Sequence, residues 1–153
     1  MQVRRIGLLF LTTVLALSHL GCENPNKDDD LDADEGSFVF VQYDEDYSGN
    51  EDFIVLHGDI ISLIDSVQVI TVNRLTHSKP AEWSTSFCVG PACLPPFLDS
   101  FTFSLAPRDT ALFSLDTYPN QVAGSGSWTM VAMDSTTMEA DSVHITLSVI
   151  NNP

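Results

Sequence analysis

The chain has 153 residues and a mass of 16.8 kDa, which is the size of one ordinary domain and excludes a multidomain protein. Hydrophobic residues make up 44% and aromatic residues 9%, so the chain has the apolar side chains for a core that a wholly disordered protein lacks. Six Lys and Arg residues against 21 Asp and Glu residues give a formal charge of −15, which repels phosphate backbones and excludes nucleic acid as a partner.

The first residues have the layout of a secretory signal peptide. Arg4 and Arg5 precede the apolar run Ile6–Leu17, which is shorter than the roughly 20 apolar residues that cross a bilayer as a helix. The run is followed by Leu20-Gly21-Cys22, which resembles the lipobox of bacterial lipoproteins, where the signal is cut before a cysteine that then carries the lipid. This resemblance implies lipidation of Cys22. The alternative is a plain secretory signal that contains a cysteine by chance.

An acidic segment follows the cysteine. Residues 23–36 carry seven acidic side chains and one basic side chain with almost nothing to bury, which predicts a solvated, extended tether. Fully stretched, these residues reach at most about 50 Å. The segment also resembles the export signal that sends some Gram-negative lipoproteins to the outer leaflet, although a soluble spacer would have the same composition. We therefore divide the chain into a signal peptide (1–21), a lipidated cysteine with its tether (22–36) and a folded domain (37–153).

A second acidic stretch, Asp44–Asp52, lies near the start of the folded part. Its oxygen-bearing side chains have the spacing of the first part of an EF-hand loop, with Gly49 at position 6. Val55 replaces the glutamate of position 12 and the flanks resemble strands, which excludes an EF-hand. An acidic hairpin tip and a different calcium-binding turn remain as interpretations. The candidate calcium ligands are Asp44, Asp46, Ser48, Asn50 and Asp52.

From Ser37 onward the sequence predicts strands. Short stretches rich in Val, Ile, Phe and Thr alternate with turn-forming clusters such as Ser48-Gly49-Asn50, and no long pattern repeats every 3.6 residues. This spacing predicts an all-β protein, an immunoglobulin-like antiparallel β-sandwich of about seven to nine short strands. The predicted strands are Phe38–Tyr43, Phe53–His57, Ile60–Leu63, Val67–Arg74, Trp83–Phe87, Phe101–Leu105, Ala111–Leu115, Ser127–Met133 and Ser142–Ile150.

A more specific pattern lies within these strands. Trp83 stands five residues before the pair formed by Cys88 and Cys93, within a longer stretch of sandwich-like sequence. This pattern looks like the immunoglobulin-like modules, with a Trp and a close Cys pair, found on many bacterial lipoproteins and secreted proteins. The likeness covers roughly Phe53–Ile150 and supports the fold and an exported location. Such modules have no known catalytic residues to transfer.

The chain has three cysteines, a number that fits an exported lipoprotein. If Cys22 is lipidated, Cys88 and Cys93 remain as a pair in an oxidising compartment, with a glycine and a proline between them that let the chain reverse. We predict a local disulfide, because five residues cannot cross a sandwich whose sheets lie roughly 10 Å apart. The competing interpretations are a redox dithiol, which usually has the spacing C-x-x-C, and a zinc site, which needs more ligands than His77 can add.

Other groups of potentially reactive residues do not indicate a metal site or a catalytic site. Met130, Met133, Met138 and His144 include ligands that suit copper, but Met130 and Met133 are an odd number of residues apart and face opposite sides of a regular strand. Gly124-Ser125-Gly126 lacks the spacing of a nucleophile elbow, and the sequence has no H-E-x-x-H motif or phosphate-binding loop. We therefore expect no cofactor, no resident metal and no catalysis.

The sequence contains four acidic–hydroxyl triplets, in which Asp is followed by Ser or Thr and then by a small, polar or aliphatic residue. They resemble the O-glycosylation sites of some Gram-negative secreted proteins, but Asp-Ser and Asp-Thr also begin turns through local hydrogen bonds, which is the interpretation we favour. The triplets are Asp65-Ser66-Val67, Asp109-Thr110-Ala111, Asp134-Ser135-Thr136 and Asp141-Ser142-Val143.

Together these features predict a lipoprotein of the bacterial outer membrane, anchored through Cys22 and facing the periplasm or the cell surface. Its single domain is expected to act as a non-catalytic binding, adhesion or structural module for a protein or carbohydrate partner. The alternative is an accessory subunit or small enzyme that acts on carbohydrate or another extracytoplasmic substrate. Exposed aromatic side chains on one face would indicate a sugar platform, whereas we expect Trp83 to be buried. We expect binding to use the loops, which are Asp44–Asp52, His77–Pro80 and Val89–Pro96.

Overall fold

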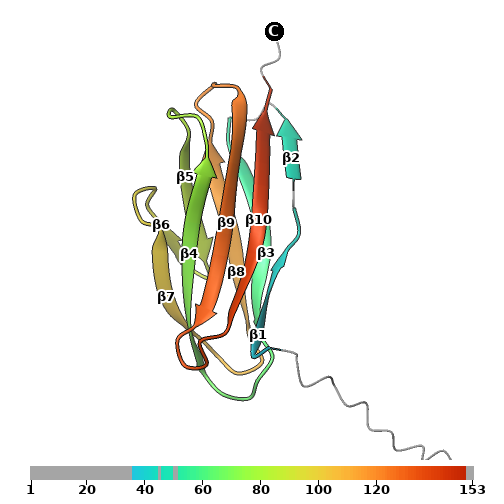
Figure 1. The fold of residues 1–153 in the computed structure, drawn as a ribbon, viewed down its shortest axis with the longest axis vertical. Helices are drawn as coiled ribbons and strands as arrows, with labels where there is room; N and C mark the ends of the chain where they lie inside the picture. The colour runs from blue at the N-terminus through green and yellow to red at the C-terminus, as the bar shows by residue number, and fades with distance from the viewer. Residues whose placement is uncertain (1–35, 45, 50–51, 151–153) are drawn as a thin grey trace, which may run out of the picture. The chain divides into compact units, whose positions relative to one another are not determined.

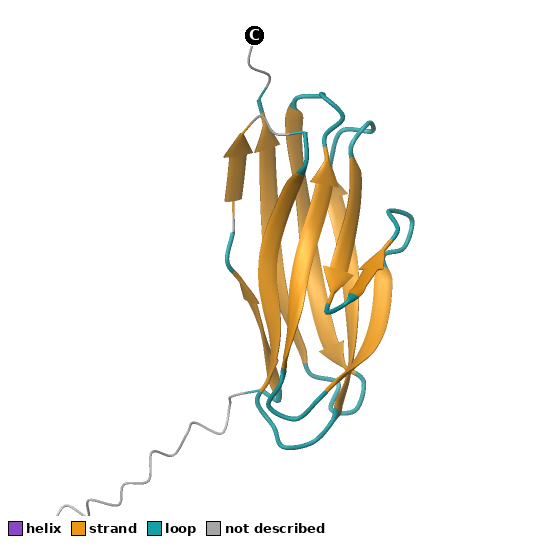
Figure 2. Ribbon diagram, turned by 180° about the vertical axis from the view of Figure 1, so that it is seen from behind, coloured by secondary structure: helices purple, strands orange, loops and turns teal. Residues whose placement is uncertain are grey.

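The computed structural model describes residues 36–44, 46–49 and 52–150, and all the regular elements in that part of the chain are β-strands (Figures 1 and 2). Two five-stranded sheets form an immunoglobulin-like β-sandwich, with the orders β1-β3-β8-β5-β6 and β2-β10-β9-β4-β7. The predicted fold class is confirmed. The strands are β1 (Phe38–Gln42), β2 (Asp46–Gly49), β3 (Ile54–Ser62), β4 (Gln68–Ser78), β5 (Ser84–Val89), β6 (Ala92–Leu94), β7 (Ser100–Leu105), β8 (Thr110–Tyr118), β9 (Gly124–Asp134) and β10 (Ala140–Val149).

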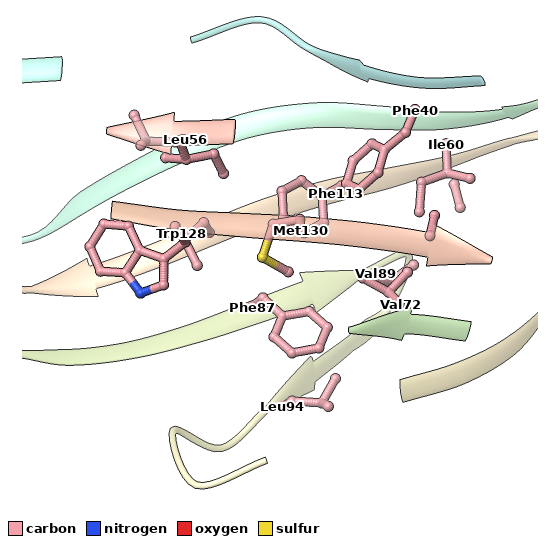
Figure 3. Close-up of a cluster of buried hydrophobic side chains, with 14 of the residues drawn as sticks. Phe40, Leu56, Ile60, Val72, Phe87, Val89, Leu94, Phe113, Trp128 and Met130 are labelled. Atoms are coloured by element: carbon pink, nitrogen blue, oxygen red, sulfur yellow. The ribbon is translucent and has the colours of Figure 1, made fainter. Parts of the chain in front are cut away.

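The alternation of apolar and polar residues builds the core between the sheets. In β9, Trp128, Met130 and Ala132 are fully buried, and the residues between them face outward. The opposite sheet supplies Phe113 and Leu115 from β8. Figure 3 shows side chains from both sheets converging in this layer. The removal of this shared apolar surface from water holds the two sheets together.

Both tryptophans belong to the core. Trp83, directly before β5, is 2% exposed, and its ring lies 6.5 Å from that of Trp128 and nearly parallel to it. The indole N–H of Trp83 donates a hydrogen bond of 2.8 Å to the carbonyl oxygen of Val122. The expected burial of Trp83 is confirmed, and the two tryptophans do not form an exposed sugar platform.

The N-terminal strands join both sheets along one side of the sandwich (Figure 1). β1 pairs antiparallel with β3 in the first sheet, whereas β2 pairs parallel with β10 in the second. The amide of Ile150 donates a 2.8 Å hydrogen bond to the carbonyl of Gly49, and the hydroxyl of Thr146 donates to the Asp46 carboxylate. The predicted turn at Ser48 and Gly49 is therefore wrong: Asp46–Gly49 is a strand, because β10 offers it an unpaired edge.

β3 is one long strand where the sequence predicts two. The predicted break falls at Gly58, yet this residue pairs with Gln42 of β1 and with Phe113 of β8. A β carbon at position 58 would collide with the carbonyl oxygen of Val41. The glycine therefore permits a close approach of β1 and does not end the strand. β2 and β6 are the two strands that the sequence does not predict.

A buried polar cluster closes one end of the sandwich, where the described chain begins. Gln68 is 1% exposed, and its side-chain amide donates to the hydroxyl of Ser37 at 3.0 Å and to the carboxylate of Asp134 at 3.1 Å. Asp134 also accepts a 2.8 Å bond from the backbone amide of Thr136. Burial raises the pKa of Asp134, but the hydrogen bonds from Thr136 and Gln68 outweigh it, so the pKa lies below its usual value. This end is thus fixed by hydrogen bonds to a carboxylate.

Candidate functional site

The candidate binding surface lies on the side of the sandwich opposite β1 and β2. A short loop, residues 95–99, joins β6 to β7 there and projects from the sandwich (Figure 2). Phe97 in this loop is 79% exposed, more than any other large apolar side chain of the described residues, and Leu98 is 44% exposed. Single exposed apolar residues are common on protein surfaces. The unusual property of this loop is how firmly its backbone is held.

Arg74 of β4 holds the loop from beneath. Its side chain is buried, and one terminal guanidinium nitrogen donates to the carbonyl oxygens of Pro96 at 2.7 Å and Leu98 at 3.2 Å. The guanidinium also donates to a carboxylate oxygen of Asp99 from two nitrogens, at 2.7 and 2.9 Å. Charge-assisted bonds of this kind are stronger than neutral ones. We call residues 95–99 the clamped loop.

The same guanidinium reaches the other sheet. Its second terminal nitrogen donates to the carbonyl oxygen of Thr85 at 2.6 Å and to the Thr85 hydroxyl at 3.2 Å. The guanidinium carbon lies 5.7 Å from the centre of the Phe87 ring, which is within the range of a cation–π contact. Arg74 therefore links β4, β5 and the clamped loop, and its buried charge is compensated by acceptors on β5 and on the clamped loop.

A disulfide fixes the neighbouring hairpin. Cys88 of β5 and Cys93 of β6 stand opposite each other in the antiparallel ladder and are bonded. Gly90 has a φ of 55° in the turn between them, a conformation that favours glycine, and its amide donates to the carbonyl of Leu112 at 2.7 Å. The predicted disulfide is present, and it braces the chain directly before the clamped loop.

An apolar groove of about 390 Å³ lies beside β7. It is lined by the β5–β6 hairpin, including Val89 and Pro91, and by the partly buried rings of Phe101 and Phe103. β7 is the last strand of its sheet, so one of its edges has no strand partner. Natural edge strands are usually protected by charged residues or proline, and β7 has neither. This edge is therefore open to a further strand.

Two larger hollows, of about 620 and 720 Å³, lie along the seam between β1 and β10. The carboxylates at this seam already accept bonds from the backbone of the opposite segment. Glu139 accepts from the amide of Ser37, and Asp141 accepts from the amide of Phe40, both at 2.8 Å. We assign these side chains to joining the strands, so the smaller groove beside β7 is the better candidate for binding.

The acidic stretch Asp44–Asp52, interpreted as a hairpin tip or a calcium-binding turn, has another arrangement. Asp46 and Ser48 are part of β2, and the carboxylate of Asp44 accepts a 3.4 Å bond from the backbone amide of His57. Asn50 lies outside the described residues. Asp52 is exposed and lies before β3. Asp46 and Ser48 thus serve strand pairing, and Asp44 bonds to the backbone of β3. Elsewhere, Met130 faces inward and Met133 outward, as the sequence predicts.

The acidic–hydroxyl triplets show local bonding. The carboxylate of Asp109 accepts from the amide of Thr110 at 2.8 Å, and that of Asp141 accepts from the amide of Ser142 at 2.7 Å. Asp134 is buried in the cluster described above. The local bonds at Asp109 and Asp134 support the turn interpretation for those two triplets, because Thr110 begins β8 and residues 135–137 form the turn after β9. Asp141-Ser142-Val143 lies within β10, so the turn interpretation is wrong for that triplet.

Sequence reasoning missed Arg74, Asp99 and Phe97. One signal was available: Arg74 continues the inward-facing register of Ile70 and Val72, so period-two alternation places its charge in the core. A charge at such a position requires buried acceptors nearby. The sequence gives no indication that these acceptors belong to the loop that follows β6.

Within the ranges that the structure describes, no three His, Cys, Asp or Glu side chains gather as a metal cage. The described residues also include no helix long and apolar enough to span a membrane.

No protein-family model matches the chain, and no curated protein matches it in sequence. Among solved structures, it is similar to the N-terminal domain of PorA, with 13% identity over 76% of this chain and 99% of that chain and a TM-score of 0.59. It is also similar to a point mutant of the enterotoxigenic E. coli adhesin CfaE, with 9% identity over 76% of this chain and 49% of that chain and a TM-score of 0.50. At these identities the likeness shows that the chain shares the β-sandwich fold of these domains.

Proposed function

We propose that this protein is an exported lipoprotein whose β-sandwich binds a protein partner, without catalysis, through the clamped loop and the open edge of β7. The observation that carries the proposal is the exposure of Phe97 on a loop whose backbone is bonded to the buried Arg74. Arg74 and the disulfide hold the loop before any partner arrives. Binding therefore costs little ordering entropy at this surface.

Phe97 has the properties of an interface anchor. Aromatic side chains that enter a partner's pocket contribute much of the energy of many interfaces. Complete burial of such a side chain contributes about 1.5–3 kcal/mol. Leu98 beside it adds apolar surface at the same point.

The edge of β7 favours a protein over a carbohydrate. An extended segment could add to β7 through backbone hydrogen bonds and place alternate apolar side chains in the groove near Phe101 and Phe103. A sugar chain offers neither the backbone ladder nor the apolar side chains. We therefore infer a partner with an exposed, extended apolar segment.

The proposed location rests on the N-terminal residues, which lie outside the described ranges. Cleavage before Cys22 would leave 132 residues and remove Arg4 and Arg5, so the formal charge would become −17. The acidic tether would then separate the domain from the lipid surface, in the outer membrane and facing the periplasm or the cell surface. This arrangement would leave the clamped loop free to meet a partner.

Photo-crosslinking in intact cells tests the binding surface. A photoreactive phenylalanine analogue replaces Phe97 in one variant and Leu112 in a control, because Leu112 is also 68% exposed but lies on the outer face of β8. We expect a discrete protein adduct from position 97 and none from position 112. Equal adducts from both positions, or none from either, would contradict the proposed surface.

A turnover screen tests the absence of catalysis. The purified protein is incubated with polysaccharides, esters and peptides, and an inert β-sandwich serves as the control. We expect no product above the control. Reproducible turnover that a single Ser, His, Asp or Glu substitution abolishes would show an enzyme.

A further inference from the structure

Two histidines lie close together on the outer face of the second sheet. His77 is near the end of β4 and His144 is in β10, and β9 lies between these strands. Both residues are exposed, and their ring centroids are 5.8 Å apart. The chain has four histidines, so the approach of two of them on one face is a specific arrangement.

Thr129 of β9 contacts both rings. Its hydroxyl oxygen lies 2.8 Å from Nε2 of His77 and 3.2 Å from Nδ1 of His144. A hydroxyl has one proton, so it donates to one ring nitrogen and accepts an N–H from the other. The second nitrogen of the His144 ring, Nε2, lies 3.3 Å from the hydroxyl of Ser127, which orients that ring. Ring nitrogens from β4 and β10 thus face the same hydroxyl, that of Thr129.

The strand register explains the arrangement. Thr129 stands directly opposite His144 in the ladder between β9 and β10. On the other side of β9, the register of β4 shifts between Thr76 and Ser78, so His77 lies in a β-bulge. Bulges redirect a side chain and are frequent beside functional sites. At this bulge the His77 ring turns toward Thr129.

We propose that His77 and His144 together bind a divalent transition-metal ion of the zinc and copper class. Imidazole nitrogen is a preferred ligand of these ions, whereas Mg²⁺ and Ca²⁺ prefer oxygen. Two nitrogen ligands of one zinc ion lie roughly 3–3.5 Å apart, given Zn–N bonds of about 2.0–2.1 Å. Both nitrogens lie within 3.2 Å of the Thr129 oxygen and are therefore at most about 6 Å apart, so ring rotations that release this hydroxyl can bring them to that separation.

The surroundings favour a cation. The formal charge of the chain is −15, and His144 shares with Asp46 the lining of the hollow of about 720 Å³ along the seam. Since no third His, Cys, Asp or Glu completes a cage within the described ranges, water fills the remaining coordination positions. Such a site binds metal reversibly. Ser127 acts as a positioning residue, because it contacts the other nitrogen of the His144 ring, Nε2. Thr129 contacts the ligating nitrogens themselves, so its hydroxyl gives way to the metal.

Titration with Zn²⁺ tests the site in the full chain carrying Cys22→Ser, which prevents lipidation. The imidazole Cε1–H signals are followed by NMR and the heat of binding by calorimetry. We expect the His77 and His144 signals to shift together with a stoichiometry of one ion. His57 lies on β3 in the other sheet, and its signal should stay in place.

Variants separate this site from other metal binding. His77→Ala and His144→Ala should each weaken Zn²⁺ binding by at least about tenfold, Ser127→Ala should weaken it by about tenfold, and His57→Ala should leave it unchanged. Mg²⁺ should not shift the imidazole signals. Equal shifts at His57, or affinity kept within twofold in either ligand variant, would overturn the proposal.

Discussion

Arg74 and Asp99 form an ion pair of 2.7 Å in which the arginine side chain is 3% exposed and the aspartate side chain is 65% exposed. The pair therefore joins the interior to the surface. Asp99 also accepts the backbone amide of Arg74 through its own carbonyl, at 2.8 Å. Removing the buried partner and removing the exposed partner should have different consequences.

Arg74→Gln should lower the free energy of unfolding by about 2–3 kcal/mol, because it leaves buried carbonyls without donors. Asp99→Asn should cost about 1 kcal/mol or less, because the carboxylate is mostly in water. Urea unfolding of the three proteins measures both values. An equal loss in the two variants would mean that the carbonyl contacts of Arg74 contribute little.

Removing the disulfide should destabilise the hairpin. The double variant Cys88→Ser, Cys93→Ser should lose roughly 2 kcal/mol of stability, the model-dependent value for so short a loop. Intact-mass measurement of the unmodified protein should show a gain of two hydrogens on reduction. Rapid alkylation of both thiols in the unreduced, folded protein would contradict the bridge.

Acid should weaken the polar cluster at Asp134. Its folded-state pKa is below the unfolded value of about 3.9, so the carboxylate contributes stability that is present above that value and is lost as the pH falls through it toward the folded pKa. Asp134→Asn should therefore have a lower urea midpoint at pH 6 and a flatter dependence between pH 6 and pH 3.

Asp65→Asn provides the matched control for this titration. The hydrogen bond from Arg108 lowers the pKa of Asp65, but both side chains are largely exposed and solvent screens them. Its pH profile should stay close to that of the unmodified protein. A profile flattened as much by Asp65→Asn as by Asp134→Asn would assign the acid sensitivity to general surface charge.

Cys22→Ser should release the protein from membranes, because it removes the residue that would carry the lipid. Fractionation of cells with detergent extraction measures the distribution. A serine variant that still partitions with the membrane fraction would show that another feature holds the protein there.

Strand alternation predicted most of the fold. The inward residues of β8 and β9, and the burial of Trp83, follow from period-two patterning and residue size. The prediction was wrong where contacts with a distant strand, and not the local preference of a residue, decided its conformation. Gly58 resembles a strand break but admits the close approach of β1, and Gly49 resembles a turn but pairs with β10.

The candidate sites were harder to predict than the strands. The disulfide between Cys88 and Cys93 follows from local spacing, so the sequence was sufficient. The contacts of Arg74 with the clamped loop, and those of His77 with His144, depend on which strands are neighbours. Strand order arises from non-local pairing, which the pattern of a single sequence does not contain.

The pairing of β2 with β10 joins positions 100 residues apart, as between Asp46 and Thr146. Contacts of such long range form late in folding, because closing a long loop costs entropy before the contact returns any free energy. A chain that emerges N-terminus first cannot complete the second sheet until its last strand, β10, is available. If the protein is exported as proposed above, this delay would keep the polypeptide unfolded during translocation until β2 and β10 meet.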